Sequence, residues 1–309
     1  MRKYLVKLLN ELLPQNWFNF LLMKPRPMLV DIHTAKTVKW VRKQGIKGIN
    51  FRGEYSSYLR KQAHILEKGI QAYNREAGHS KAQYEKVKRL IEKSECDITN
   101  QWASNILSKY ESLQKGTLIE SDVHIDIFNS NISKTDFYEF TKARRSIRNF
   151  KKEKIDNDLL AEIASLLNWA PNSCNRQTAK LYATDDDGKI SECMRLNGGA
   201  TCMNTPSHFM TLTSNTLSYM LPVEYSAAYI DASLAAQNFI LALHANGIGS
   251  CVLNWTHASA EQNEMLREKM CIPDNELIVF NLVIGYPEKN IYSSSKKSID
   301  ETLVLNTSR

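Results

Sequence analysis

The feature that most constrains the fold is the segment from Ala227 to Ala245, which as a helix would be apolar almost all round. A helix that is apolar on nearly all sides needs neighbours all around it, so the segment predicts a helix buried on every side in a layered domain. Asn246-Gly247 predicts a left-handed cap at its C-terminal end. Two β-rich runs follow, Ile248–Leu253 and, after the turn Pro273-Asp274-Asn275, Leu277–Ile284. This half of the chain therefore combines helices with a sheet.

A second helix is predicted after Asp156, where apolar residues from Leu159 to Leu167 recur at helical spacing and Pro171 ends the pattern. The chain from about Tyr55 to Tyr110 is polar and helical in composition, with two or three amphipathic helices broken near Gly78. Residues 112–140 are typical of a connecting segment. We therefore expect a mainly helical N-terminal extension over 1–140 and a second domain over 141–309.

The first residues carry apolar side chains on one helical face, from Tyr4 to Leu12, and an apolar aromatic run follows from Trp17 to Met23. Two interpretations stay open: an interfacial helix in peripheral contact with a membrane, or a helix docked on the protein or on its dimer mate. Residues 1–60 hold 12 Lys and Arg against 3 Asp and Glu, a balance of 12 − 3 = +9 in a chain of net charge +7. Because no nucleic-acid motif accompanies these charges, we expect no nucleic-acid partner.

Six cysteines show neither a CxxC pair nor a dense framework, so the sequence indicates no metal site and no disulfide scaffold. The N-terminus lacks the layout of a signal peptide, and no run reaches the roughly 20 apolar residues that span a bilayer. These observations favour a cytoplasmic protein with reduced thiols.

Three clusters carry the chemistry. The first, Arg144 to Arg148, holds three cations and a hydroxyl, which suit bidentate contacts to a phosphate, although a solvated basic turn has the same composition. The second, Ala170 to Gln177, offers amide and hydroxyl groups to a polar ligand, although Asn- and Ser-rich loops are common. In the third, a buried helix leads into Gly247-Ile248-Gly249, where the missing Cβ atoms would let backbone approach a flat ligand.

Taken in order, RRSIRNF, APNSCNRQ, DASLAAQN, GIGSC and VIGYP resemble the nitroreductase-like flavoprotein family across about residues 141 to 305. His64 to Ile70, HILEKGI, is also similar to a segment found ahead of this domain in a subgroup often associated with surface-polysaccharide genes. The resemblance implies an α+β fold, with three α/β/α layers, that binds FMN at a homodimer interface.

Carried over position by position, the resemblance assigns the FMN phosphate and ribityl chain to Arg144, Arg145, Ser146 and Arg148. It brings four residues to the flavin from the other subunit: Pro171, Asn172, Ser173 and Asn175. Backbone groups of three consecutive residues and one glycine would line the isoalloxazine or phosphate side: Leu253, Asn254, Trp255 and Gly285. A basic pair, Lys296 and Lys297, would close over the phosphate.

Two departures from the family pattern stand in the second cluster. Gln177, Thr178 and Ala179 replace the usual Gln-Pro-Trp, so a packing anchor is missing, and Asn172 replaces a serine. These changes predict an altered loop and altered side-chain contacts to the flavin, while the phosphate site is kept.

The resemblance implies an FMN-dependent oxidoreductase that takes a hydride from NAD(P)H and reduces a small organic substrate by ping-pong kinetics. With the cofactor carrying the reaction, no side chain need be a nucleophile, and His208, His244 and His257 are interpreted as structural. Two alternatives remain: an FMN oxidase or dehydrogenase of polysaccharide or natural-product biosynthesis that uses no nicotinamide, and a catalytically inactive binding or scaffold protein.

Overall fold

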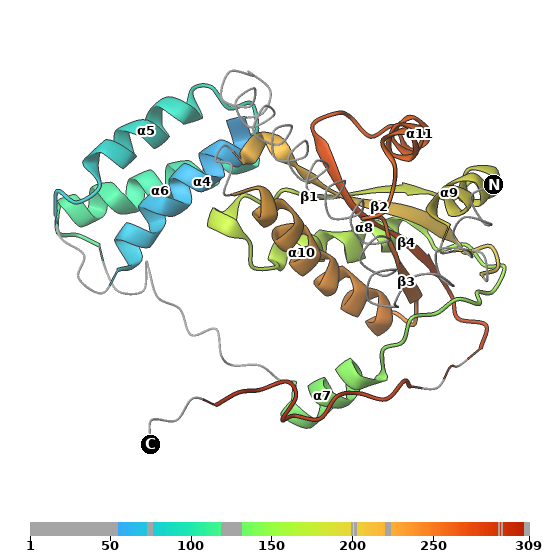
Figure 1. The fold of residues 1–309 in the computed structure, drawn as a ribbon. Coiled ribbons are helices and arrows are strands. Elements are labelled where there is room, and N and C mark those ends of the chain that lie inside the picture. The colour runs from blue at the N-terminus through green and yellow to red at the C-terminus, as the bar shows by residue number, and fades with distance from the viewer. Residues whose placement is uncertain are drawn as a thin grey trace, which may run out of the picture. The chain divides into compact units, whose positions relative to one another are not determined.

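The computed structural model describes residues 55–72, 77–118, 132–198, 200, 203–219, 224–289, 291 and 293–305, and Figure 1 shows its helices and strands. Packing divides the chain into two units. Unit 1 comprises Met1–Asp122, Ser173–Thr178 and Asn215–Tyr229; unit 2 comprises Val123–Asn172, Ala179–Ser214 and Ile230–Arg309. The segments predicted within residues 4–23 lie outside the described residues. The domain boundary at residue 140 stays a prediction.

Three helices form the larger part of the described residues of unit 1: α4 (Tyr55–Gln71), α5 (Lys81–Ile91) and α6 (Asp97–Gln114). Each packs against the other two through buried apolar side chains, which include Leu66 of α4, Val87 of α5 and Ile106 of α6. Gly78 lies in the turn before α5 with φ +85°, a conformation that glycine adopts without strain. The predicted amphipathic helices and the break near Gly78 are confirmed.

Unit 2 is built on a four-stranded sheet with the order β1-β2-β4-β3. The strands are β1 (Ala179–Thr184), β2 (His208–Asn215), β3 (Gly249–Asn254) and β4 (Glu276–Gly285). The outer pairs, β1 with β2 and β3 with β4, are antiparallel. β3 and β4 coincide with the two predicted β-rich runs to within about one residue at their ends, whereas β1 and β2 were not predicted.

Helices cover the sheet on both sides. α9 (Asp187–Asn197) and α11 (Ala260–Met270) pack into one apolar cluster with side chains of the strands, among them Phe209 and Val283. α10 (Tyr225–Ala245) lies on the opposite side of the strands from α9 and α11 (Figure 1). The predicted α+β fold with three layers is confirmed.

The expectation that the Ala227–Ala245 helix is buried on every side is wrong for the single chain. Most apolar residues of α10 are buried, but Ile230 and Leu234, one turn apart, are 56% and 43% exposed. Gly247, with φ +69°, caps the helix as predicted, and the Ile248 amide donates to the Leu243 carbonyl at 2.9 Å. Within the described part of the chain, none of the helices combines the length and the apolar character that crossing a bilayer requires.

The segment between the two halves also differs from expectation. Residues predicted to connect the domains include most of α7 (Lys134–Ala143), which begins where the Ser133 hydroxyl accepts a hydrogen bond from the Asp136 amide. None of the α7 side chains is fully buried, and its ten residues are too few to show a long apolar repeat in the sequence. The next helix, α8 (Asn157–Ser165), has the predicted Asp156 cap, whose carboxylate accepts from two backbone amides.

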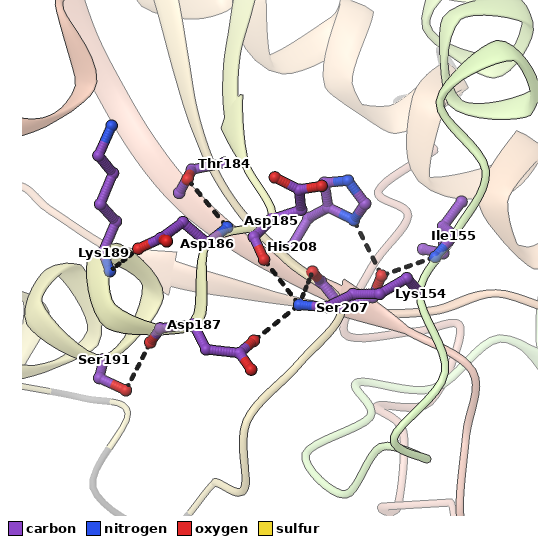
Figure 2. A network of polar contacts seen from close by, with 10 residues as sticks. All are labelled: Lys154, Ile155, Thr184, Asp185, Asp186, Asp187, Lys189, Ser191, Ser207 and His208. Atoms are coloured by element: carbon purple, nitrogen blue, oxygen red, sulfur yellow. Dashed lines mark hydrogen bonds and ion pairs between the residues drawn. The ribbon is translucent and has the colours of Figure 1, made fainter.

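A polar network fastens the chain before α8 to the start of β2 (Figure 2). The Lys154 ammonium donates to the Asp185 carbonyl and to the Asp187 carboxylate, each at 2.7 Å. The Ser207 hydroxyl oxygen accepts from the Ile155 amide at 2.8 Å and lies 2.9 Å from Nδ1 of His208. A hydroxyl has one donor and two acceptor lone pairs, so Ser207 can bond the Ile155 amide and the His208 imidazole at the same time.

We expect His208 to make the protein less stable as the pH falls. Burial lowers its pKa, the Asp185 charge raises it, and Lys154 lowers it. Below the unfolded pKa of about 6.5, the unfolded chain gains a proton that the folded chain takes up only at lower pH, so the free energy of unfolding decreases. His208→Asn should reduce this decrease, measured by urea denaturation at pH 7.5, 6.5 and 5.5.

The matched control for this prediction is His257→Asn, at an exposed histidine. If the His208→Asn and wild-type proteins lose the same free energy of unfolding over this pH range, His208 is not the group responsible.

Candidate functional site

The Arg144–Arg148 cluster follows α7 and leads into a segment that lies along the sheet. Ser146 forms a parallel bridge with Ser250 of β3, and the Ile147 amide donates to the Ser250 carbonyl at 2.9 Å. Further on, Phe150 forms an antiparallel bridge with Pro287 just after β4. The backbone of 146–150 is therefore fixed at both ends.

Two glycines allow this close approach. Gly249 and Gly285 are partners across β3 and β4, and the segment 146–150 passes over both. A Cβ at Gly249 would lie 2.7 Å from Cγ1 of Ile147, and a Cβ at Gly285 would lie 2.9 Å from Cδ1 of Phe150. The Cβ side of Gly249 is thus occupied by the chain's own Ile147, and the approach of a flat ligand to this backbone stays a prediction.

A cavity of about 410 Å³ opens beside this crossing. Its volume lies within the range of small-molecule sites, roughly 300–1,000 Å³. Its polar lining comes from two guanidinium groups, one imidazole and one hydroxyl: Arg144, Arg145, His244 and Ser250. Ala143, Ile147, the chain Gly247–Gly249, Pro287 and Ile291 complete the wall. Two of the predicted phosphate ligands, Arg144 and Arg145, therefore share one cavity.

The cations at this cavity keep most of their hydrogen-bonding capacity. Arg145 donates to the carbonyls of Lys142 and Arg144, and Arg148 donates to the Ser146 carbonyl at 3.4 Å. Within the described residues, none of the three guanidinium groups forms an ion pair with a carboxylate. Because each guanidinium carries five N–H donors, ample capacity remains for an anion.

The arginines make the site electrostatically positive, and their charges affect the pKa values of two neighbouring side chains. Burial lowers the pKa of His244, and the charges of Arg144 and Arg145 lower it further. Burial raises the pKa of the Cys251 thiol, while Arg148 and Arg144 act in the opposite direction. A neutral imidazole and a neutral thiol are therefore favoured here, and the arginines supply the positive charge.

His244 is the cavity residue whose role the sequence missed. It lies in the last turn of α10, and its ring faces Phe140 of α7 with centroids 4.9 Å apart. The available signal was the Asn246-Gly247 cap, which ends α10 beside the GIGSC run and so brings His244 to the same place.

The residues Leu253, Asn254, Trp255 and Gly285 do not line this cavity. Leu253 and Trp255 are buried in the apolar cluster beneath α9 and α11, and the Trp255 indole donates to the Asn263 side chain at 2.8 Å. The Asn254 side-chain oxygen accepts from the amide and the hydroxyl of Thr256. Their proposed backbone contacts to a cofactor stay predictions.

The second predicted cluster has an unusual backbone. Pro171 is exposed, and the Asn172 amide group donates to the Ala170 carbonyl at 3.1 Å. A short 3-10 turn, η3 (Ser173–Asn175), follows in unit 1, and Cys174, Asn175 and Gln177 all adopt positive φ. The structure contains a loop of left-handed residues here, and the predicted difference from the family's loop stays a prediction.

The basic pair Lys296 and Lys297 is exposed and lies in an irregular stretch after β4. Neither lysine lines the cavity. Their predicted closure over a phosphate stays a prediction.

The second half of the chain matches the sequence model of a known protein family. Residues 141–197 and 204–286 match the sequence model of the nitroreductase family. The predicted resemblance is confirmed for these residues. The match covers the segment that contains the arginine cluster, both glycines and all four strands.

Individual relatives agree with that match. The chain is 25% identical over 175 residues to a candidate NADH dehydrogenase/NAD(P)H nitroreductase of Methanothermobacter thermautotrophicus, covering 56% of this chain and 86% of the relative. It is 23% identical over 158 residues to an FMN reductase (NADPH) of Bacillus subtilis, covering 46% and 62% respectively. The structure of a nitroreductase-like protein of Streptococcus mutans has the same fold, with a TM-score of 0.50, 15% identity, and coverage of 56% of this chain and 99% of that one.

We expect Gly249→Ala to destabilise unit 2, because the new methyl group would overlap Ile147 in a packed core. Overpacking of this kind costs about 1–3 kcal/mol. The measurement is the free energy of unfolding in urea, with Gly188→Ala as the control. A Cβ at Gly188 would meet Oδ1 of Asp186 at 3.2 Å, the oxygen that accepts from the Lys189 amide at the start of α9. Because alanine is favoured over glycine in a helix, we expect that variant to lose less stability than Gly249→Ala. Equal stability of the two variants would contradict the close approach.

Proposed function

We propose that residues 141–309 form an FMN-dependent oxidoreductase domain that uses NAD(P)H to reduce a small organic substrate. The observation that carries the proposal is the cavity in which Arg144 and Arg145 lie without carboxylate partners among the described residues. A dianionic phosphate would offset the repulsion between these cations, and its oxygens would accept hydrogen bonds from their N–H groups. The family match and the flavin reductase among the relatives support FMN as the phosphate-bearing ligand.

The residues present fit this cofactor. Arg144 and Arg145 would hold the phosphate from the cavity wall, with Ser146 and Arg148 contacting the phosphate or the ribityl chain. Pro171, Asn172, Ser173 and Asn175 would approach the flavin from the partner subunit. When bound, FMN supplies two-electron chemistry, and the protein binds it, orients it and controls access.

The described side chains near the cavity are suited to binding, and none is prepared as a nucleophile. The raised pKa of Cys251 keeps the thiol protonated, and thiols react as thiolates. Ser207 and His208 lie within hydrogen-bonding distance, but both are buried, and the serine oxygen also accepts from the Ile155 amide. This arrangement agrees with a reaction carried by a bound cofactor, in which donor and acceptor occupy the same pocket in turn.

The first experiment tests the cofactor and the donor together. We expect the purified full-length protein to be yellow, to release FMN on denaturation, and to lose its absorption near 450 nm when NAD(P)H is added without oxygen. Bleaching by an organic substrate alone, with peroxide formed in air, would instead identify an oxidase of the polysaccharide or natural-product type. A colourless protein without affinity for added FMN would overturn the proposal.

Replacing Arg144 and Arg148 together with alanine should lower FMN affinity at least tenfold. Each charge-assisted hydrogen bond contributes about 1.5–3 kcal/mol, and about 1.4 kcal/mol corresponds to a factor of ten. The dissociation constant is measured by titrating the apoprotein with FMN and following flavin fluorescence. Arg195→Ala, at an exposed arginine of α9 outside the cavity, is the control and should bind as wild type does. Unchanged affinity in the double variant would place the phosphate elsewhere.

We further propose that the exposed apolar side of α10 forms a homodimer interface. Ile230 and Leu234 lie one turn apart on this side, and a hydrogen bond of 3.5 Å from Asn238 to the Leu166 carbonyl links α10 to η2 (Leu166–Trp169). Trp169 there is 79% exposed. Large exposed apolar groups on neighbouring elements are typical of a contact surface.

Ile230→Glu with Leu234→Glu should convert the dimer to a monomer, because two carboxylates would be buried without partners at the interface. Light scattering after size-exclusion chromatography measures the mass. Ile98→Glu is the matched control, since Ile98 is an exposed isoleucine of α6, and it should leave the mass unchanged. A wild-type protein of monomer mass, or a double variant that remains dimeric, would contradict this interface.

A further inference from the structure

The loop Ser173–Thr178 holds a backbone that its own sequence does not favour. Cys174, Asn175 and Gln177 have φ of 58°, 53° and 51°. Asparagine tolerates the left-handed region, but a cysteine or glutamine there costs free energy and persists only where surrounding contacts enforce it. Inside the loop, the Gln177 amide group donates to the Asn175 side chain at 2.8 Å.

Arg176 ties this loop to the rest of unit 1. Its side chain is only 2% exposed, and Nη1 donates to the Ser173 carbonyl at 3.1 Å, which closes the loop on itself. Nη2 donates to the Glu224 carboxylate, and Nε has no acceptor among the described residues. A buried guanidinium group is strongly destabilising when its carboxylate partner is removed, because its charge is then uncompensated.

Glu224 extends the connection to α4. Its carboxylate also accepts from the Lys61 ammonium at 3.2 Å, and the Lys61 and Glu224 side chains are 15% and 19% exposed. Lys61, Glu224 and Arg176 therefore form a continuous charged chain from a helix of the first half of the sequence to the loop.

A second contact holds the far end of the loop. The Arg176 guanidinium lies over the Tyr219 ring, 5.0 Å from its centroid, and the Tyr219 hydroxyl is 2.8 Å from the Thr178 hydroxyl. The Asn215 amide donates to the Thr178 carbonyl at 3.0 Å. The tyrosine and the threonine are both buried, so these bonds are shielded from water.

We infer that Lys61, Glu224 and Arg176 are positioning residues that hold the Ser173–Thr178 loop in its left-handed conformation. The helices of the first half of the chain thereby frame a loop that lies in the second half. This inference rests on the proposed function for its consequence, because Ser173 and Asn175 are the loop residues proposed to approach the flavin. The helical region then sets the geometry of that approach, while the arginines at the cavity provide the phosphate site.

The test uses the full-length protein and Glu224→Gln, which leaves Arg176 buried without a charged partner. Amide hydrogen exchange of the peptide covering 173–178 should become about tenfold faster or more, as expected for losing a hydrogen bond to a charged group. The visible absorption band of bound FMN should also shift. Glu192→Gln is the matched control, since it removes the carboxylate of the partly buried Lys269 ion pair in unit 2 and should change neither measurement. Loop exchange at the wild-type rate in folded Glu224→Gln would overturn the inference.

Two further variants separate positioning from simple charge compensation. Arg176→Met combined with Glu224→Gln removes both charges, so global stability should recover relative to Glu224→Gln, while loop exchange and the flavin band remain altered. Recovery of all three would overturn the positioning role. Lys61→Met breaks only the α4 end and should speed loop exchange about threefold, within the range of partly exposed ion pairs, which gives a test even where Glu224→Gln fails to fold.

The two proposals fail in different ways. If the wild-type protein binds no FMN, the proposed function falls, and the exchange measurements still decide whether the charged chain holds the loop. If FMN binds and loop exchange is unaffected by all of these variants, the positioning role falls and the oxidoreductase proposal stands.

Discussion

The close packing of residues 146–150 against Gly249 and Gly285 is the contact on which the candidate site depends. Ile147 and Phe150 are buried in the apolar cluster under α9 and α11, and backbone hydrogen bonds hold both ends of the segment. The side chains beside these anchors, including those of Ser146 and Arg148, therefore project from a backbone whose position is fixed. A site on such a backbone is preorganised, so less conformational entropy is lost when a ligand binds.

The charges at this backbone are arranged differently from those elsewhere in unit 2. Lys154 and Lys269 each form an ion pair with a carboxylate, Asp187 and Glu192 respectively. The guanidinium groups of Arg144, Arg145 and Arg148 have no such partner among the described residues. Burial lowers the pKa of His244, and the charges of Arg144 and Arg145 lower it further. Clustering like charges without counter-charges costs free energy in the absence of an anion. A binding site for an anionic ligand explains that cost, whereas a solvated basic turn gives no reason for a cavity beside it.

The sequence predicted those parts of the fold that a local pattern encodes. α8 was predicted from its Asp156 cap and apolar spacing, and β3 and β4 from β-rich runs between turn residues. β2 was missed because it is buried on both faces yet carries His208, Thr211 and Thr213, so neither alternation nor an apolar run marks it. Its polar groups are satisfied by distant partners: Thr211 donates to Asn281 and Thr213 to Glu276, each at 2.7 Å.

The candidate site was predictable to a similar extent and for a similar reason. The arginine cluster is contiguous, so composition and order reveal it. The charged chain at the loop is not contiguous, because Arg176 lies 48 residues from Glu224 and Lys61 lies 163 residues from it. The sequence showed only that the usual packing anchor after Gln177 is missing. The contacts that hold this loop are the buried Arg176 and the bond between Thr178 and Tyr219, and three-dimensional packing alone brings those residues together.

The two packed units of the chain do not coincide with its two halves in sequence. A boundary placed by composition follows the order of the residues, whereas packing assigns two segments of the second half, Ser173–Thr178 and Asn215–Tyr229, to the unit built on the N-terminal helices. The arginine cavity is made by unit 2 alone. The proposed positioning of the loop and the proposed phosphate site therefore belong to different units, so changes in the helical region should alter the loop and leave the arginine cavity unchanged.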